Sequence, residues 1–412
     1  MDSLTVVERS PGMGRRGGKV ARSARSVGDG MQTYYEFFAG GGMARIGLGA
    51  DWHCLFANEF SEKKAAAYRL NFGPSRELKV QDVATLTTED IAGSATLAWA
   101  SFPCQDLSLA GNGKGLKGER SGTFHAFWSL IEQLDSQGRG VPLVVLENVV
   151  GAITSNGGRD FRTIIEVVTQ AGYRVGPLVM DAARFVPQSR PRLFLVGVKQ
   201  DLPLPPALVS GEPSEVWHSK ALLAAYERLP ASTRERCVWW RLPEPHRLSA
   251  TLAELVEAEP EGVPWHTADE TQRLLSLMSD TNLNKVRKAQ AYGKIIVGTV
   301  YKRIRVEDGG EKRQRAEVRF DQISGCLRTP VGGSSRQLIL VVHGRSIRSR
   351  LLSPREAARL MGVPESYRLP DRYNEAYHLM GDGVAVPVVR WLSKHLLSPL
   401  AQTIHRRSLK AA

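Results

Sequence analysis

Four short stretches of the chain place chemically active side chains at the ends of expected strands. In the first, Phe102-Pro-Cys-Gln105, Cys104 follows directly after an apolar stretch that predicts a buried strand. Pro103 ends that strand, because proline has no N–H to give to the sheet. Ligands of open α/β sheets bind at the carboxyl ends of the strands. Cys104 is therefore a candidate nucleophile, although a cysteine taken alone is more often a core residue.

Two further stretches supply a carboxyl group and two guanidinium groups. Leu146-Glu-Asn-Val149 ends a second apolar run, and a carboxyl between apolar walls can give up a proton near neutral pH. Glu147 is thus a candidate acid, with a purely structural carboxyl as the alternative. Gln188-Ser-Arg-Pro-Arg192 places Arg190 and Arg192 on one face if the segment is extended. Such guanidinium forks could hold a carboxylate, a phosphate or a base carbonyl, but a solvated pair would have the same sequence.

The fourth stretch, Phe37-Phe-Ala-Gly-Gly-Gly42, predicts a turn from a strand into a helix, where a ligand can approach the backbone. Glu59 and Asp82 end the next two expected strands, where carboxylates can accept hydrogen bonds from a ribose and an adenine amino group. The Gly-Lys-Ser/Thr ending of a phosphate loop is absent, so a nucleoside triphosphate is not expected. Each acid alone could be a solvated loop residue. Together they fit an adenosine-containing ligand held without phosphates.

A glycine-rich basic segment follows Cys104. It contains Lys114, Lys117 and Arg120 among five glycines. A flexible basic loop beside a nucleophile is typical of a lid that closes on a polyanion. An ordinary surface loop would explain the glycines but not their position next to Cys104.

Composition narrows the class of protein. The 412 residues carry a formal charge of +13, which suggests a polyanionic partner. The four cysteines show no C-x-x-C spacing, which disfavours a metal site or a disulfide framework and favours a reducing, cytoplasmic compartment. No stretch is long and apolar enough for a membrane span, and no secretory signal is apparent.

The pattern of expected elements predicts an α/β fold with a doubly wound, mostly parallel Rossmann-like sheet. Residues 1–30 form an expected disordered basic tail. A catalytic and cofactor-binding domain is expected over 31–200, completed by a C-terminal helix in 378–400. Prolines, and local positive charge in 301–350, mark a smaller, irregular, β-containing domain over 201–350. A connecting helix and loop follow at 351–377, opened by the capping box Ser353-Pro-Arg-Glu356. The expected strands are 33–39, 52–57, 78–80, 96–102, 141–147, 174–183 and 192–199, and the expected helices are 61–71, 122–135, 158–171 and 384–397.

The four stretches, in this order and spacing, resemble the DNA cytosine-5 methyltransferase family. The resemblance covers residues 33–199 and 322–397, including Leu352–Pro364, which is similar to the helix that connects the family's domains. It implies the methyltransferase fold and methyl transfer from S-adenosylmethionine to C5 of cytosine in duplex DNA, with the target base flipped out. It also implies that the second domain reads the DNA sequence, through a glycine-rich segment that includes Cys326–Arg336.

The resemblance also implies roles for single residues. Cys104 would attack C6 of cytosine, Glu147 would bind N3 and the exocyclic amine, and Arg192 would hold O2. Arg190 would lie beside the thiol and a phosphate. Positions that would contact the cofactor are Phe38, Ala39, Gly40, Gly42, Glu59, Phe60, Asp82, Pro103, Asp382 and Val384. Positions that would contact DNA are Gln105, Ser108, Lys114, Lys117, Arg120, Arg328, Ser334, Ser335 and Arg336. No metal is expected.

One position departs from the family pattern: Asp382 stands where the family usually has asparagine. This puts cofactor affinity, or its coupling to loop closure, in question, and an altered methyl donor is one alternative. A tRNA methyltransferase of the same fold and a catalytically silent DNA-binding regulator are the others. The resemblance implies a bacterial enzyme that is associated with the nucleoid and has duplex DNA as its partner. We expect the enzyme to be a monomer. A cognate restriction endonuclease could accompany the enzyme without being physically required.

Overall fold

The computed structural model describes residues 31–103, 122–245, 250–306, 309–329 and 335–411. The contacts between residues divide the chain into two units, Met1–Met31 and Gln32–Ala412, and the second contains every element described below. The expected basic tail, residues 1–30, lies outside the described residues.

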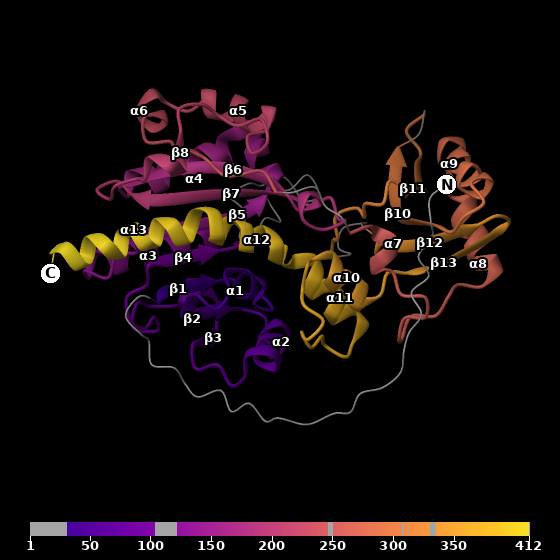
Figure 1. Ribbon diagram of the computed structural model, residues 1–412, viewed down its shortest axis with the longest axis horizontal. Helices are drawn as coiled ribbons and strands as arrows, with labels where there is room; N and C mark the ends of the chain where they lie inside the picture. Colours follow the sequence, from indigo (N-terminus) through magenta and orange to yellow (C-terminus); the bar gives the residue numbers. More distant parts are fainter. Residues whose placement is uncertain (1–30, 104–121, 246–249, 307–308, 330–334, 412) are drawn as a thin grey trace, which may run out of the picture. The chain divides into compact units, whose positions relative to one another are not determined.

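A seven-stranded sheet forms the centre of the larger part of the molecule (Figure 1). Its spatial order is β3-β2-β1-β4-β5-β7-β6. Only β7 runs antiparallel to its neighbours, and the remaining paired strands are parallel, so the prediction of a mostly parallel sheet is confirmed. The strands are β1 (Gln32–Phe37), β2 (Trp52–Glu59), β3 (Leu78–Val80), β4 (Leu97–Ala100), β5 (Leu143–Val149), β6 (Tyr173–Asp181) and β7 (Pro191–Lys199).

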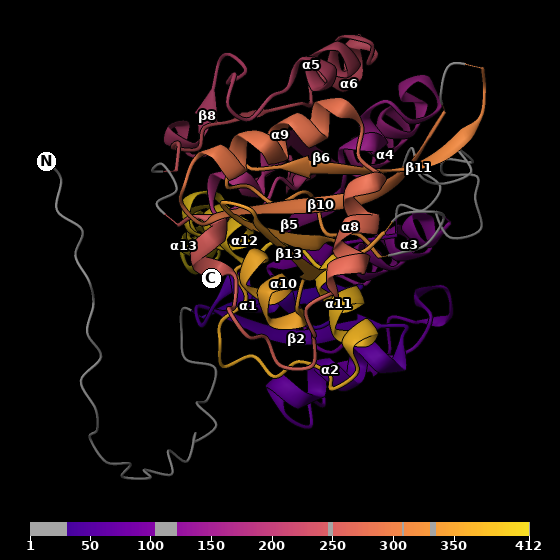
Figure 2. The same cartoon turned by 90° about the vertical axis from the view of Figure 1, so that its right-hand side faces the viewer.

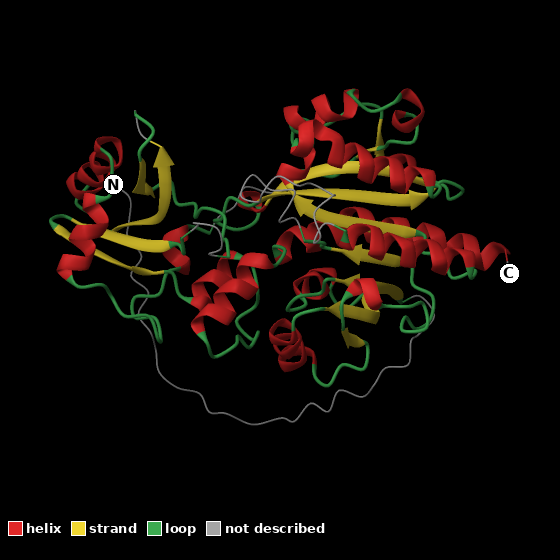
Figure 3. Ribbon diagram, turned by 180° about the vertical axis from the view of Figure 1, so that it is seen from behind, coloured by secondary structure: helices red, strands yellow, loops and turns green. Residues whose placement is uncertain are grey.

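Helices cover both faces of this sheet, as Figure 3 shows. Successive strand residues alternate between two hydrophobic cores: Tyr34 and Trp99 face one core, whereas Tyr35 and Ala98 face the other. This alternation is the period of two that a strand buried on both faces requires. The first core includes residues of α1 (Met43–Leu48), α2 (Glu62–Phe72), α12 (Val386–Leu392) and α13 (Ser398–Ala411), and the second those of α3 (Thr123–Ser136) and α4 (Arg159–Gln170).

Part of the proline-rich stretch after residue 200 packs onto the free edge of the large sheet. Val179 in β6 donates its N–H to the carbonyl of Trp217 at 2.7 Å, and Val238 donates to Val175 at 2.9 Å. The short elements of this stretch are β8 (Val209–Ser210), α5 (Lys220–Glu227), α6 (Ala231–Arg234) and β9 (Trp239–Trp240). They extend the fold around β6, although the sequence there shows no periodic pattern.

A second, antiparallel sheet has the order β11-β10-β12-β13, built from β10 (Ile296–Val306), β11 (Lys312–Arg319), β12 (Leu338–His343) and β13 (Ser346–Leu351). One face packs against α8 (Ala268–Ser276) and α9 (Asp280–Ala291) in a small core that includes Val300, Ala316 and Leu340. The short helix α7 (Leu252–Leu255) precedes them. The β-type runs predicted in this part of the chain are confirmed.

The helix predicted from the capping box is confirmed as α10 (Pro354–Leu360). The Ser353 hydroxyl accepts the N–H of Glu356, and the Glu356 carboxylate accepts the N–H of Ser353. A further helix, α11 (Tyr373–Asp382), then occupies a segment where a loop was expected up to residue 377. The last expected helix begins at Val386 and, through a π-helical turn at Ser393–Leu397, continues as α13. No helix in the described part of the chain is long and apolar enough to cross a membrane.

Candidate active site

A cavity of about 830 Å³ lies at the carboxyl ends of the strands of the large sheet. Parallel strands leave their ends at one edge, so residues of β1, β2 and β5 line its walls, together with Ser101, which directly follows β4. Glu147 and Arg192 line it, whereas Arg190 does not. All expected cofactor positions line it except Gly42, namely Phe38, Ala39, Gly40, Glu59, Phe60, Asp82, Pro103, Asp382 and Val384.

Glu59 holds the glycine turn in place. Its Oε2 accepts the N–H of Gly40 at 2.8 Å, and its Oε1 accepts the N–H of Ser61 at 2.8 Å. Gly42, which lies outside the cavity, begins α1 with φ at 78°, a left-handed conformation that favours glycine. The carboxylate that ends β2 thus fixes the backbone at the end of β1 and keeps lone pairs for a ligand.

Glu36 is a cavity residue that the sequence did not single out. It is buried at 1% exposure, and its Oε2 has no hydrogen-bond partner among the described residues. Burial raises its pKa to about 8, although the guanidinium of Arg45 works in the opposite direction. A carboxyl of this kind holds its proton near pH 7 and can donate a hydrogen bond to a ligand. The only signal in the sequence was its place three residues before Ala39, where the Ala-Gly turn begins.

One aromatic residue, Phe60, and one acidic residue, Asp82, complete the outer wall of the cavity. Phe60 is 74% exposed, so its ring offers a stacking surface at the edge of the cavity. Asp82 accepts the N–H of Ala84 at 2.9 Å and thereby caps a short 3₁₀ helix. Asn58, by contrast, is buried; it donates to the carbonyl of Gln81 at 2.8 Å and ties the ends of β2 and β3 together.

Glu147 and Arg192 form an ion pair inside the cavity, with Arg192 Nε 3.2 Å from Glu147 Oε1. Their side chains are only 10% and 15% exposed. The antiparallel register of β5 and β7 brings them together, because Arg192 lies opposite Val149, two residues after Glu147 on the same face of β5. We expected apolar walls around Glu147, but these walls include the guanidinium group of Arg192. Asn148 donates to the carbonyl of Phe102 at 3.3 Å and links β5 to the segment that leads to Cys104.

Several predicted residues lie outside the described part of the chain, so the structure does not place them. They are Cys104, Gln105, Ser108, Lys114, Lys117, Arg120 and Ser334.

Arg190 is fully buried, and its guanidinium joins three segments. It donates to the carbonyl of Leu327 at 2.9 Å and to those of Gly381 and Gly383 at 2.7 Å each. Its Nη1 also lies 3.4 Å from Cys326 Sγ. Burial and the neighbouring Arg192 lower the pKa of Arg190. The guanidinium thus holds Leu327 and the end of α11 against the start of β7.

The remaining DNA-contact candidates have protein partners of their own or are exposed. Ser335 Oγ accepts the N–H of Lys302 at 2.8 Å. Arg336 donates to Asn374 and lies over the Tyr373 ring, with 5.3 Å to the ring centroid. Arg328 is exposed.

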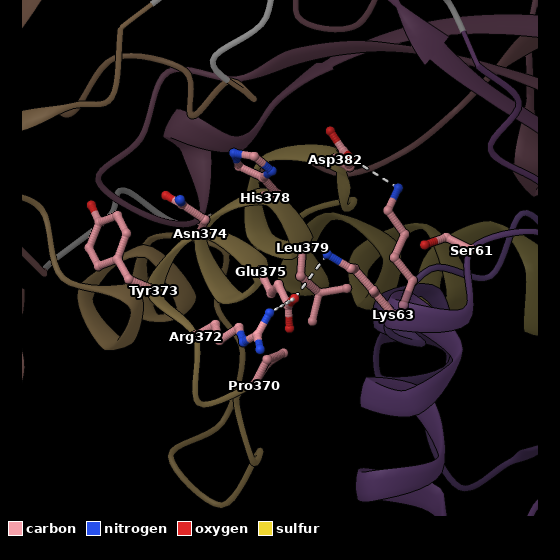
Figure 4. Close-up of a pocket in the computed structure, with 11 residues that line it drawn as sticks. Ser61, Lys63, Pro370, Arg372, Tyr373, Asn374, Glu375, His378, Leu379 and Asp382 are labelled. Atoms are coloured by element: carbon pink, nitrogen blue, oxygen red, sulfur yellow. Dashed lines mark ion pairs between the residues drawn. The ribbon is translucent and has the colours of Figure 1, made fainter.

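Asp382 connects α11 to two other segments. Its Oδ2 lies 2.8 Å from Lys64 Nζ, and its other oxygen accepts from the Thr329 hydroxyl. A second cavity of about 570 Å³ shares Lys64 and Asp382 with the first (Figure 4). In this cavity Lys63 lies 3.0 Å and Arg372 3.8 Å from Glu375, along the dashed lines in Figure 4.

The larger cavity fits an adenosine-containing cofactor without phosphates. The orphaned oxygen of Glu36, the carboxylate of Glu59 and the open ring of Phe60 provide polar and stacking partners. A glycine turn without a phosphate-binding lysine, at the edge of a mostly parallel sheet, defines the class as an S-adenosylmethionine-dependent methyltransferase.

Comparison with known proteins identifies the family. The model of the C-5 cytosine-specific DNA methylase family matches residues 32–398, and the chain belongs to that family. Type II methyltransferase M.HpaII of Haemophilus parainfluenzae is 26% identical over 374 residues, covering 89% of this chain and 90% of the relative. M.HhaI of Haemophilus parahaemolyticus is 22% identical over 377 residues, covering 89% and 94%. The protein is therefore a DNA (cytosine-5)-methyltransferase, whose methyl donor is S-adenosylmethionine.

Solved structures show the same fold. Entamoeba histolytica methyltransferase EhMeth aligns with a TM-score of 0.59 at 14% identity, covering 90% of this chain and 99% of the other. Dnmt2 of S. pombe aligns with a TM-score of 0.52 at 17% identity, with the same coverage. These similarities confirm the predicted fold class.

Proposed function

We propose that the protein methylates C5 of cytosine in duplex DNA through a transient bond between Cys104 and C6 of an extruded base. The observation that carries the proposal is the Glu147–Arg192 pair, 3.2 Å apart in the cavity that also contains the cofactor positions. The positive charge of the chain supports a polyanionic substrate. When bound, S-adenosylmethionine supplies an electrophilic methyl group.

Glu147 and Arg192 are close enough to hold one pyrimidine ring. O2 and N3 are neighbouring acceptors on the cytosine ring, so Arg192 can donate to O2 while a protonated Glu147 donates to N3. A donor at N3 stabilises the negative charge that develops when a thiolate adds to C6. The buried position of both side chains strengthens this interaction, because little water competes.

Cys104 would form the S–C6 bond as a thiolate, and C5 would then become nucleophilic enough to take the methyl group. Loss of the C5 proton to a base, breakage of the S–C6 bond and return of the N3 proton to the Glu147 carboxylate would restore the aromatic ring, the thiolate and the acid. The sequence neighbour Pro103 lines the cavity, which supports a thiol at its edge. A base inside a duplex cannot reach this cavity, so the target base must be extruded.

Glu59, Glu36 and Phe60 would hold the methyl donor. Glu59 is positioned to accept hydroxyl groups of the ribose, and the exposed ring of Phe60 to stack on the adenine. Arg190 would act through the backbone: it keeps the turn after α11 and the recognition segment next to β7.

The proposal is tested by transfer of tritiated methyl groups to duplex DNA by the wild-type protein and by Cys104→Ser. We expect incorporation to fall to background in the variant. Bisulfite sequencing of DNA from an expressing host then gives the target site. Undiminished incorporation by Cys104→Ser would refute the nucleophile assignment.

Two more substrates separate the alternatives. DNA that contains 5-fluorocytosine traps a working nucleophile as a covalent complex, and a silent DNA-binding regulator would form none. Methylation of tRNA in preference to duplex DNA would instead favour the tRNA branch of the fold.

A further inference from the structure

A two-stranded ribbon projects from the smaller sheet. Strand β12 pairs with β10 only as far as Val300, and the N–H of Lys302 is bonded to Ser335 Oγ. Beyond that point, within the described residues, 303–306 of β10 pair only with 312–315 of β11. Figure 2 shows these outer halves running past α8 and α9. Four residues of extended chain reach about 13 Å beyond the sheet.

Four arginines share one face of this ribbon. The register places Arg303 opposite Arg315 and Arg305 opposite Arg313, and directly opposite residues have their side chains on the same face. Like charges in that arrangement destabilise a strand pair. Packing does not explain these arginines, because the ribbon has no hydrophobic core: even Ile304, on the opposite face, is 55% exposed.

Acidic neighbours balance this charge only in part. Glu317 lies 2.5 Å from Arg305 and 3.5 Å from Arg303, and Glu311 lies 3.0 Å from Arg313. Residues 301–319 contain seven Lys or Arg and four Asp or Glu, so the ribbon remains positive.

The arginine face is on the same side of the sheet as the recognition segment. Tyr301, two residues before Arg303, shares this face, and its hydroxyl donates to the carbonyl of Cys326. Leu327 follows Cys326, and Arg190 donates to its carbonyl. Arg190 directly precedes β7, which begins at Pro191 and continues with Arg192. The opposite face of the sheet is covered at its base by the core beneath α8 and α9.

We propose that the arginine face of the β10–β11 ribbon, Arg303, Arg305, Arg313 and Arg315, binds the phosphates of duplex DNA that flanks the target base. The inference rests on the proposed action on duplex DNA. Arginine forks bind phosphate oxygens in pairs, and a phosphate between opposing arginines removes their mutual repulsion. Such contacts contribute affinity and salt dependence but carry no sequence information.

The test compares two double variants that remove the same charge from opposite faces of the ribbon. Arg305→Gln/Arg313→Gln removes one opposing pair from the arginine face. Lys302→Gln/Lys312→Gln is the matched control, because the register places both lysines on the other face. The probe is a fluorescein-labelled duplex of about 30 base pairs with mixed sequence, and the dissociation constant is measured over a series of salt concentrations.

For the arginine variant we expect weaker binding at low salt and a plot of log K against log salt whose slope is smaller by about 2. The lysine variant should retain the wild-type slope to within about 0.5. In methyl transfer, the arginine variant should show a raised KM for DNA at unchanged kcat. The midpoint of thermal unfolding should change little, because the variant removes both the repulsion between the two arginines and their exposed ion pairs, each of which is weak.

A wild-type slope in the arginine variant would overturn the proposal, as would equal effects of the two double variants. Either result leaves the proposed function standing if the wild type still methylates duplex DNA. Failure of the wild type to methylate duplex DNA would refute the proposed function, independently of how the variants bind.

Discussion

Lys64 Nζ lies 2.8 Å from Asp382 Oδ2, and the two side chains form an ion pair. The pair joins α2 to the end of α11, and both residues line both cavities. The second oxygen of Asp382 accepts a hydrogen bond from the Thr329 hydroxyl. The acidic side chain thus joins the end of α11 to α2 through an ion pair and to Thr329 through a hydrogen bond.

Asp382→Asn should remove the ionic link and keep the hydrogen bond from Thr329. Burial alone would raise the pKa of Asp382, but Lys64, Thr329 and Arg190 hold it below its ordinary value of 3.8. A lowered pKa in the folded state stabilises the protein above pH 3.8, and this stabilisation is lost as the pH falls through the folded value. With side chains 30% and 41% exposed, the pair contributes no more than about 1 kcal/mol.

Thermal unfolding of both proteins between pH 3.5 and 8 checks this prediction. The wild type should be slightly more stable at neutral pH, and the difference should shrink toward the acid limit and in high salt. A constant difference across the whole range would show that the ion pair is not its source.

Glu147→Gln should slow methyl transfer by about 10²- to 10⁴-fold, because the amide cannot pass a proton to N3. Glutamine keeps an oxygen near Arg192, so the fold and the dissociation constant for DNA should change little. Single-turnover kinetics with a saturating methyl donor measure the effect. The control is Glu166→Gln, which removes a half-buried carboxylate paired with Arg162 on α4, outside the cavity. Equal rates for the two variants would exclude Glu147 from the chemistry.

The strands of the large sheet were predictable because they are buried on both faces. The apolar run at 141–147 predicts a buried strand, and β5 is observed there. The proline after Phe102 predicts the end of a strand, and β4 ends shortly before it, at Ala100. The site residues at the ends of these strands followed from the same logic. The cavity therefore brings Glu147 together with Glu59 and Asp82, although they are far apart in the sequence.

Other features depend on tertiary contacts that leave no local pattern. Arg190 and Arg192 alternate only if both belong to one strand, but β7 begins at Pro191, and the Arg190 guanidinium turns to buried carbonyls. Glu36 resembles any residue of an apolar strand until its burial is known. Trp217 reaches β6 through a main-chain bond, which side-chain periodicity does not encode.

Glu36→Gln should stabilise the protein above neutral pH. Burial raises the pKa of Glu36 from 4.5 to about 8, while Arg45 lowers it and Glu59 raises it. Because the pKa is raised in the folded state, the wild type has its full stability below pH 4.5, where Glu36 is protonated in both states. It loses stability as the pH rises toward 8, because only the unfolded state then releases the proton freely. Over this window the wild type should lose up to about 1.4 kcal/mol per pH unit relative to the variant.

Urea denaturation of the wild type and Glu36→Gln at pH 5, 7 and 9 tests this window. The difference in the free energy of unfolding should grow from pH 5 to pH 7 and level off above the folded pKa. Identical pH profiles would mean that Glu36 is ionised throughout and that its cavity oxygen has a partner.

Arg350→Met should destabilise the protein by about 3 to 5 kcal/mol, because it leaves a buried carboxylate without its cation. Arg350 and Glu356 are 0% and 1% exposed and lie 2.6 Å apart, and the same carboxylate caps α10. The matched control is Arg348→Met, since Arg348 is 51% exposed and should contribute no more than about 1 kcal/mol. Urea denaturation measures both.

The double variant Arg350→Met/Glu356→Gln keeps the test informative if the single variant does not fold. Glutamine retains the cap on Ser353 and removes the buried charge, so the double variant should recover part of the lost stability. A double variant less stable than Arg350→Met alone would show that the guanidinium acts through packing and its bond to the carbonyl of Glu257, rather than by neutralising Glu356.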